Sequence, residues 1–258
     1  MMRVKYGPMI SEMTWQEVRD AVDEGYGLIL VVGSNEQHGP HLPLATDTLE
    51  ALAIAKGVAE RTRTLVATPL YYGYKSKPLS GGGQGFPGTI SLRGATLIYL
   101  VRDIICDFIR CGFKKITVMN HHMENINFIY EGIDLAMREA NEPSARVISI
   151  DNPYATIDQR AIADMFPEDF PGWDVEHAAI TETSLMLALY PELVRRERIK
   201  DDEAERHPPY DMIPAPADTI PASGVLYKAT YGTKEKGKQL YELVVEGIAA
   251  AIRREFGD

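Results

Sequence analysis

Short apolar runs alternate with longer amphipathic stretches along most of the chain. The run 28–32 (Leu-Ile-Leu-Val-Val) has no polar position and ends at Gly33, as expected of a strand that is buried on both faces of a parallel sheet. Similar runs predict strands at 65–70, 115–119 and 146–150. Strands that alternate with helix-length segments are typical of a parallel sheet covered by helices. The sequence therefore predicts an α/β fold with a mostly parallel central sheet.

The amphipathic stretches predict the covering helices. Thr14, with Glu17 three residues later, forms a capping-box pattern for a first helix that runs through Val22. The remaining helices are expected at 47–63, 95–111, 125–139, 178–190 and 234–256. The proline-containing segment 191–232 is expected to be an ordered excursion on the surface or in a subunit contact. We find no internal repeat and no interdomain linker, so the prediction is a single domain over 1–258.

Composition narrows the function classes. The chain has 258 residues, is 45% hydrophobic, and carries a net charge of -10, which argues against sequence-independent nucleic-acid binding because that requires Lys and Arg. Its two cysteines, Cys106 and Cys111, cannot form a disulfide framework and are expected to be core thiols. Residues 1–13 lack an apolar stretch of signal-peptide length, and no membrane-spanning run is present. We expect a soluble, cytoplasmic protein with no membrane partner.

Two polar clusters follow predicted strands, where ligands bind in open α/β sheets. The segment 36–41 (Glu-Gln-His-Gly-Pro-His) follows the first strand, and Asp47 lies nine residues beyond His38. The segment 120–125 (Asn-His-His-Met-Glu-Asn) follows the strand at 115–119. Imidazole and carboxylate groups without sulfur suit a reactive zinc, manganese or iron site better than a structural zinc site.

If the two clusters converge, their carboxylates and imidazoles can hold two divalent cations, with one carboxylate bridging. Two cations ~3.5–4 Å apart generate a hydroxide and polarise a carbonyl together. The candidate ligands are Glu36, His38, Asp47, His122 and Glu124.

Each candidate also has a structural explanation. Asp47, with Glu50 three residues later, can simply cap the following helix. Glu124 can favour the positive end of the next helix. His41 and His121 can be polar loop residues without a ligand role. The coincidence of both clusters at strand ends favours the metal interpretation.

A third element is the segment 172–177 (Gly-Trp-Asp-Val-Glu-His), with Glu182 five residues after His177. A histidine beside carboxylates can move protons; the alternative is a helix start with a packed Trp173 and a solvated His177. The glycine-rich stretch 80–88 lacks a Gly-Lys-Ser/Thr ending, so it does not predict a nucleotide site. It is expected to close over a small ligand, with Ser80 offering a hydroxyl.

The chain resembles the creatininase family, the creatinine amidohydrolases and their relatives, nearly from end to end. The blocks that carry the resemblance are 33–39, 73–76 with 80–83, 86–89, 172–177 and 182–191. The resemblance implies a compact α/β hydrolase that assembles as a homohexamer and uses two divalent metal ions per subunit, Zn²⁺ or Mn²⁺.

The resemblance also implies roles for individual residues. One cation would be held by Glu36, Asp47 and His122. The other would be held by His38, Asp47 and Glu124. His177 would transfer protons. In the mechanism that we expect for these residues, Glu176 or Glu182 keeps His177 oriented and raises its basicity. The residues implied in catalysis are His177, Glu124 and Glu182, and those implied in substrate binding are Ser80, Met123, Trp173 (on a mobile flap), Asp174 and His177.

Two departures from the family pattern concern the substrate. Creatinine-hydrolysing members have Gly-His-Tyr-Glu where this chain has His121, His122, Met123 and Glu124, so an aromatic residue with a hydroxyl is lost. Pro153 stands where those members carry a second pocket tryptophan. The metal residues are unchanged, which predicts intact hydrolytic machinery acting on a substrate that need not be creatinine.

The leading hypothesis is a hydrolase in which a metal-activated hydroxide attacks the carbonyl of a small cyclic amide of the creatinine type and breaks its C–N bond. The alternative is a C–C bond hydrolase that opens a cyclic diketone of inositol catabolism, of the 3-dehydro-scyllo-inosose type; the polar His121 suits such a hydroxylated ring. A metal-binding or ligand-binding protein without turnover is a third hypothesis, which the presence of His177 and Trp173 disfavours.

Overall fold

A parallel sheet forms the centre of the molecule in the computed structural model, which describes residues 7–81 and 83–257. Within that part of the chain the strands are β1 (Gly27–Val32), β2 (Thr64–Val66), β3 (Lys115–Asn120) and β4 (Arg146–Ile150). They pair in parallel in the order β2-β1-β3-β4. The predicted α/β class is therefore confirmed. Gly82 of the glycine-rich stretch and residues 1–6 lie outside the described residues.

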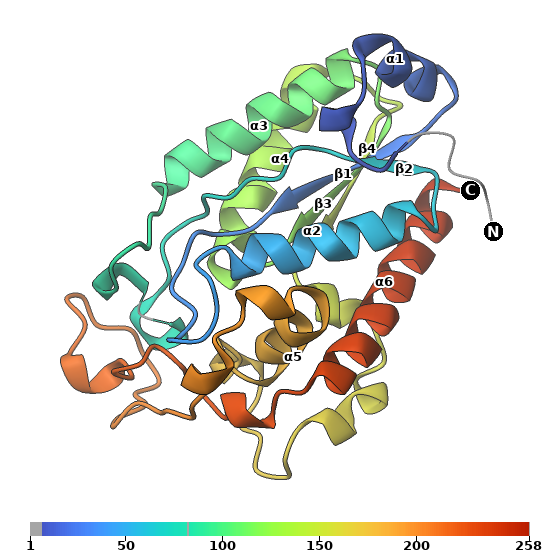
Figure 1. Cartoon of the computed structure of the whole chain (residues 1–258). Helices are drawn as coiled ribbons and strands as arrows, with labels where there is room; N and C mark the ends of the chain where they lie inside the picture. Colours follow the sequence, from blue (N-terminus) through green and yellow to red (C-terminus); the bar gives the residue numbers. More distant parts are fainter. Residues whose placement is uncertain (1–6, 82, 258) are drawn as a thin grey trace.

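Helices cover both faces of the sheet (Figure 1). They are α1 (Trp15–Asp23), α2 (Thr46–Ala59), α3 (Gly94–Arg110), α4 (Ile126–Ala140), α5 (Ile180–Leu189) and α6 (Lys234–Phe256). Helices α3 and α4 pack together on one face, with α1 beside them, and α2, α5 and α6 form the layer on the other. Among the described residues, no helix is long and apolar enough to cross a membrane.

The apolar run of β1 follows from this layering. Leu28, Leu30 and Val32 belong to the core on the α3–α4 side, whereas Ile29 and Val31 belong to the core beneath α2 and α6. Successive side chains of a strand point to opposite faces of a sheet. A strand covered on both sides therefore needs apolar residues at every position.

Helix α1 begins as its sequence predicts. The Thr14 side chain accepts a hydrogen bond from the backbone N–H of Glu17, and the Glu17 carboxylate accepts one from the backbone N–H of Thr14 at 2.7 Å. These two bonds complete the capping box.

Two predicted boundaries are wrong at the edge of the sheet. The strand predicted at 65–70 ends at Val66, because Pro69 has no N–H for a ladder; Leu70 then makes an isolated bridge to Val32. The helix predicted to reach residue 63 ends at Ala59. The Arg63 carbonyl already accepts a hydrogen bond from the Gly27 N–H of β1, at 2.9 Å.

The prediction of two core thiols is wrong for Cys111. Cys106 is half-buried in α3 and its thiol lies 3.6 Å from the Ala136 carbonyl oxygen, whereas Cys111 is exposed at the C-cap of the same helix. The predicted helix 95–111 included Cys111 as its last residue, whereas the observed helix ends at Arg110 and leaves Cys111 exposed at its C-cap.

The contact between β1 and α2 fixes the position of the first helical turn of α2. A Cβ atom on Gly33, directly after β1, would lie within 2.8 Å of the backbone nitrogen of Thr48. Only glycine allows the helix to approach this closely. The close approach sets the place of Asp47, the residue before Thr48.

Gly33→Ala is accordingly expected to displace the start of α2 and lower the free energy of unfolding by about 1–3 kcal/mol, measured by urea denaturation of the metal-free protein. Gly85→Ala is the control, since a Cβ there meets nothing within 4 Å, and its effect should stay within about 0.5 kcal/mol. Equal losses of stability in the two variants would contradict the close-packing explanation.

Candidate functional site

The two polar clusters meet because β1 and β3 are neighbours in the sheet. Val32 at the end of β1 pairs with Asn120 at the end of β3, so the loops that follow both strands leave the same edge. Asn120 holds the second loop in place: its side chain donates to the His122 carbonyl at 2.7 Å and accepts from the His122 N–H at 3.2 Å. The sheet therefore brings together residues that are far apart in the sequence.

Asp47 lies at the centre of the site. The residue is 2% exposed. Its Oδ1 lies 3.1 Å from Nε2 of His38, and its Oδ2 lies 3.4 Å from Nδ1 of His122. The capping interpretation is wrong, because the N-cap of α2 is Ala45 and no side chain caps the helix. Each oxygen of this carboxylate faces a different imidazole, which is the arrangement that a bridging ligand requires.

Backbone carbonyls orient both imidazoles. Nδ1 of His38 lies 3.0 Å from the Glu36 carbonyl oxygen, and Nε2 of His122 lies 2.9 Å from the Tyr74 carbonyl oxygen. A ring nitrogen that donates to a carbonyl leaves the other nitrogen free as a ligand. In both histidines the free nitrogen is the one that faces Asp47.

Two groups of possible ligands share Asp47. The side chains of Glu36, Asp47 and His122 are all buried, and their ligand atoms lie within 4.8 Å of one another, as the first expected set requires. The second group consists of His38, Asp47 and Glu182. In this second group, Glu182 takes the place in which Glu124 was expected. Its Oε1 lies 3.6 Å from Nε2 of His38.

Glu124 lies at the edge of this cluster, in the short turn Met123–Asn125. Its Oε2 is 3.5 Å from Nε2 of His122. Its Oε1 accepts hydrogen bonds from the Ser80 hydroxyl and from the Lys77 N–H. The carboxylate is thus joined to the glycine-rich stretch rather than to the first amides of α4.

The charges of the cluster are strongly coupled. Burial raises the pKa of the Asp47 carboxyl, but the positive charge of His38 and His122 outweighs it and holds the pKa far below its usual range. Burial likewise lowers the pKa of His38, but the Glu182 and Asp47 carboxylates raise it well above its usual value. The same balance, with Glu36 as the main partner, raises the pKa of His122.

This donor set fits divalent cations. Oδ2 of Asp47 is buried without a hydrogen-bond partner, although buried polar atoms are normally satisfied. The cluster holds anionic oxygens and oriented imidazoles with no sulfur, which suits zinc or manganese. A cation between Glu36, Asp47 and His122 would satisfy the unpartnered oxygen.

His177 is not solvated: the residue is 8% exposed. Its Nε2 lies 2.9 Å from Nε2 of Gln37 and 3.9 Å from Oε1 of Glu36. The predicted orienting residues bond elsewhere, since Glu176 accepts from Thr181 and Glu182 accepts from the Ala178 N–H at 2.6 Å. The partner of His177 is therefore Gln37.

Sequence reasoning missed Gln37, although it stands between Glu36 and His38 in the first cluster. Its amide Nε2 also lies 2.9 Å from the Gly81 carbonyl oxygen and 3.0 Å from that of Gly224. Gln37 thereby links the glycine-rich stretch and the proline-containing excursion to the site. The signal available in the sequence was its position between two candidate ligands.

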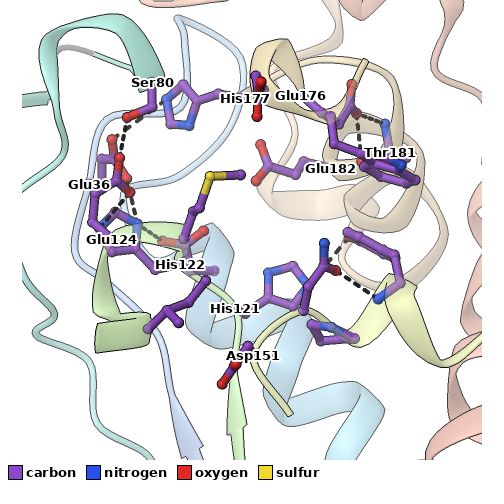
Figure 2. A pocket seen from close by; sticks show the side chains of 18 residues that line it. Glu36, Ser80, His121, His122, Glu124, Asp151, Glu176, His177, Thr181 and Glu182 are labelled. Carbon is purple, nitrogen blue, oxygen red and sulfur yellow. Dashed lines mark hydrogen bonds and ion pairs between the residues drawn. The ribbon is translucent and has the colours of Figure 1, made fainter. Parts of the chain in front are cut away.

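A cavity of about 260 Å³ opens beside the cluster (Figure 2). All the expected substrate-binding residues line it: Ser80, Met123, Trp173, Asp174 and His177. Pro153 lines it as well, and the next residue, Tyr154, stacks on Trp173 with ring centroids 5.1 Å apart and planes at 14°. Tyr154, which the sequence interpretation did not single out, thus provides a second aromatic wall.

The two remaining cluster histidines differ in position. His41 is fully buried, and its Nε2 bonds the hydroxyl of Thr183 at 2.9 Å. Burial lowers the pKa of His41 to about 4, so this residue serves as a neutral packing group. His121, by contrast, lines the cavity.

A known protein family matches this chain over most of its length. The family model described as "Creatininase: Creatinine amidohydrolase" matches residues 11–252. The creatinine amidohydrolase of Pseudomonas putida is 46% identical over 251 residues, which cover 96% of each chain. The 3-dehydro-scyllo-inosose hydrolase of Thermotoga maritima is 27% identical over 96% of this chain and 83% of its own.

Solved structures agree over nearly the whole length. A structure named "Creatininase Mn" superimposes with a TM-score of 0.93 at 44% identity, covering 98% of this chain and 100% of that one. A mutant creatininase described as Zn-Zn type gives a TM-score of 0.94 with the same identity and coverage. The family model matches most of the chain, and the relatives and solved structures agree with it over nearly the whole length. The chain therefore belongs to the creatininase family.

Proposed function

We propose that this protein is a divalent-metal-dependent amidohydrolase that opens a small cyclic amide of the creatinine type at its C–N bond. The observation that carries the proposal is the buried Asp47 carboxylate, whose two oxygens face the free nitrogens of two oriented imidazoles. The name of the Pseudomonas putida relative supplies the substrate class.

The proposed cofactors are two divalent ions per subunit, zinc or manganese. Glu36, Asp47 and His122 would hold one ion, and His38 and Asp47 would hold the other. Bound in this way, the ions supply polarisation of a substrate carbonyl and activation of water near neutral pH. Glu124 is the proposed third ligand of the second site, and Glu182 is the competing candidate because it is grouped with His38 and Asp47.

Protein groups would supply the remaining steps. We propose that His177 gives a proton to the leaving nitrogen, since it lies at the cavity wall beside Glu36. Gln37 positions its imidazole through the contact between their Nε2 atoms. Glu182, which bonds the Ala178 N–H next to His177, is proposed to hold that residue's backbone in place.

The cavity walls would orient the ring. Trp173 and its stacking partner Tyr154 offer an aromatic surface, and Ser80 offers a hydroxyl beside Glu124. Met123 and Asp174 complete the proposed binding surface on the rim. We propose that Trp173, in the short turn Trp173–Val175, moves as a flap when substrate enters.

Three further proposals concern the domain organisation, the oligomeric state and the cellular location of the protein. We propose that residues 1–258 form one domain, since a single sheet carries both helical layers. We also propose a homohexamer, as the family resemblance implies, and exposed aromatic side chains such as Trp15, Tyr99 and Tyr130 offer surface for subunit contacts; light scattering tests the number of subunits. A cytoplasmic location is proposed from the exposed thiol of Cys111, which suits a reducing compartment.

The second candidate function is opening of a cyclic diketone of the 3-dehydro-scyllo-inosose type by C–C cleavage. Polar residues in the cavity favour it, among them His121 and Asn152, because a hydroxylated ring needs hydrogen-bond partners. The identity to the relative with this activity is lower than to the creatinine amidohydrolase.

Ring opening of creatinine by protein loaded with Mn²⁺ and Zn²⁺ tests the proposed function. Turnover is expected with metal, loss of turnover after treatment with a chelator, and recovery when metal is restored. The diketone is assayed in parallel. Consumption of the diketone with creatinine inert would replace the first function by the second, and inertness toward both compounds would overturn both.

A further inference from the structure

The aromatic wall of the cavity continues behind Trp173, outside the cavity itself. Trp173 stacks on Tyr154, and both residues line the cavity. The Trp173 ring also meets the rings of Phe166 and Phe170 edge to face, with centroids 5.5 Å and 6.2 Å away. Phe166 and Phe170 stack on each other at 4.1 Å. The segment 166–173 therefore carries one packed aromatic group, whose cavity-lining member is Trp173.

Asp169, in the middle of this segment, is bound to the proline-containing excursion. Its carboxylate accepts hydrogen bonds from the Tyr227 hydroxyl at 3.0 Å and from Nζ of Lys228 at 2.7 and 2.9 Å. The ring of Tyr227 also lies 5.7 Å from that of Phe170. We call the contacts of Asp169 with Tyr227 and Lys228 the clasp. None of these three residues lines the cavity, so the clasp acts on Trp173 from outside.

The excursion is the anchored side of the clasp. Val225 and Ala229, which flank the clasp residues in the sequence, are fully buried and pack together. The backbone N–H of Leu226 donates to the carbonyl of His177 at 3.2 Å. Tyr227 and Lys228 are therefore held by buried neighbours, in register with the residue proposed to transfer protons.

The segment 166–173 is the less constrained side. The side chain of Asp169 is 67% exposed. Gly172, which directly precedes Trp173, has a φ of 123°, in a region that favours glycine. A Cβ atom on Gly172 would meet nothing within 4 Å, so the surroundings leave room for the backbone to turn there. The position of Trp173 accordingly depends on contacts made elsewhere in the segment, and the clasp provides them.

The clasp is weak enough to open. Hydrogen bonds from Lys228 and Tyr227 hold the pKa of the Asp169 carboxyl below its usual range, so the carboxylate stays charged at neutral pH. The ion pair is nevertheless near the surface, and such pairs contribute little stability and are screened by salt. A contact of this kind can release and form again without unfolding the core around it.

We propose that Asp169, Tyr227 and Lys228 are positioning residues that hold Trp173 against the cavity through the aromatic group of segment 166–173. When the clasp opens, Phe170 loses its support and Trp173 is free to leave Tyr154. The cavity then lacks one aromatic wall, and substrate binds less tightly. This inference rests on the proposed function, in which Trp173 moves as a flap, and it assigns the control of that movement to residues outside the cavity.

The fluorescence of Trp173 tests the clasp without any turnover. Trp15 and Trp173 are the two tryptophans of the chain, so every variant is made in a Trp15→Phe background, and each is compared with that background. Asp169→Asn and Tyr227→Phe are each expected to raise the acrylamide quenching constant of Trp173 about twofold, because the released indole becomes accessible to the quencher.

Glu168→Gln is the matched control for Asp169→Asn. Glu168 is the adjacent residue, is also exposed, and has no side-chain partner among the residues that the structure describes. The control removes the same charge from the same segment and should keep the quenching constant of the background protein. Equal quenching constants in Asp169→Asn and Glu168→Gln would overturn the proposal.

Steady-state kinetics of ring opening separate positioning from chemistry. Asp169→Asn is expected to raise KM about two- to fivefold and to change kcat by less than about twofold, because the clasp does not touch the reacting atoms. Lys228→Arg should keep KM near the background value, whereas Lys228→Met should raise it. Asp169→Asn combined with Lys228→Met should raise KM no further than either change alone, since both remove the same contact. A lower kcat with unchanged KM in Asp169→Asn would contradict the positioning role.

Salt gives an independent test, because acrylamide is uncharged and the clasp contains an ion pair. Raising NaCl from about 0.05 M to about 1 M should increase the quenching constant of Trp173 in the background protein and in Glu168→Gln, but not in Asp169→Asn. The same salt response in all three proteins would contradict the clasp.

The quenching experiments also separate this inference from the proposed function. If the metal-loaded enzyme opens no ring, the proposed function fails, while a higher quenching constant in Asp169→Asn still supports the clasp. If creatinine is hydrolysed but Asp169→Asn leaves the quenching constant unchanged, the proposed function stands and the clasp is overturned.

Discussion

Asp47→Asn is expected to remove at least one of the two metal ions and to lower kcat/KM for ring opening by more than about 10³-fold, because several kcal/mol of transition-state stabilisation depend on the ions. The amide keeps the shape of the carboxylate but replaces one anionic oxygen with a donor group. Since Oδ1 faces His38 and Oδ2 faces His122, the substitution affects both proposed sites. Metal content by atomic absorption and steady-state kinetics measure the two effects.

Three further variants make this experiment specific. Asp23→Asn changes an exposed residue of α1 and should keep both ions and full activity. Glu124→Gln and Glu182→Gln distinguish the two candidates for the third ligand of the second site, since the true ligand should lose one ion when replaced. Two ions and native activity in Asp47→Asn would refute the bridging role.

His177→Gln is expected to lower kcat by about 10²–10⁴-fold, the usual contribution of a general acid or base, while leaving KM and metal content near their native values. The imidazole lies at the cavity wall and is held by Gln37, so its removal takes away a proton donor without opening the cluster around Asp47. Stopped-assay kinetics and metal analysis provide the measurement.

The control for this variant is His207→Gln, which changes an exposed histidine of the proline-containing excursion and should leave all three quantities unchanged. Because Glu36, His38 and His177 also form a compact group, loss of an ion in His177→Gln would assign it a ligand role instead of proton transfer.

The hydrophobic pattern determined the fold class and most elements. Apolar runs such as that of β1 have one stable environment, the interior between two helical layers, and the last helix was predicted with its observed bounds, Lys234–Phe256. The pattern failed where single backbone groups decide the outcome. Pro69 ended a ladder within an apolar run, and Cys111 fell at the C-cap of α3, where it is exposed.

The sequence also determined which groups could bind metal, because imidazoles and carboxylates concentrate in the loops after the first and third strands. It did not determine which carboxylate lies beside which imidazole. The grouping of Glu182 with His38 and Asp47 and the contact of Gln37 with His177 both join segments that are distant in the chain.

The sequence thus identifies the candidate ligands, because it shows both the residue types and their places directly after the predicted strands. Which carboxylate meets which imidazole depends on distances of 3–4 Å between separate helices and loops. Those distances are set by the packing of α2 against the sheet and of α5 against α2 and α6, with close approaches such as that of Gly33 to Thr48. Only the tertiary structure could decide them, because packing depends on the whole core at once.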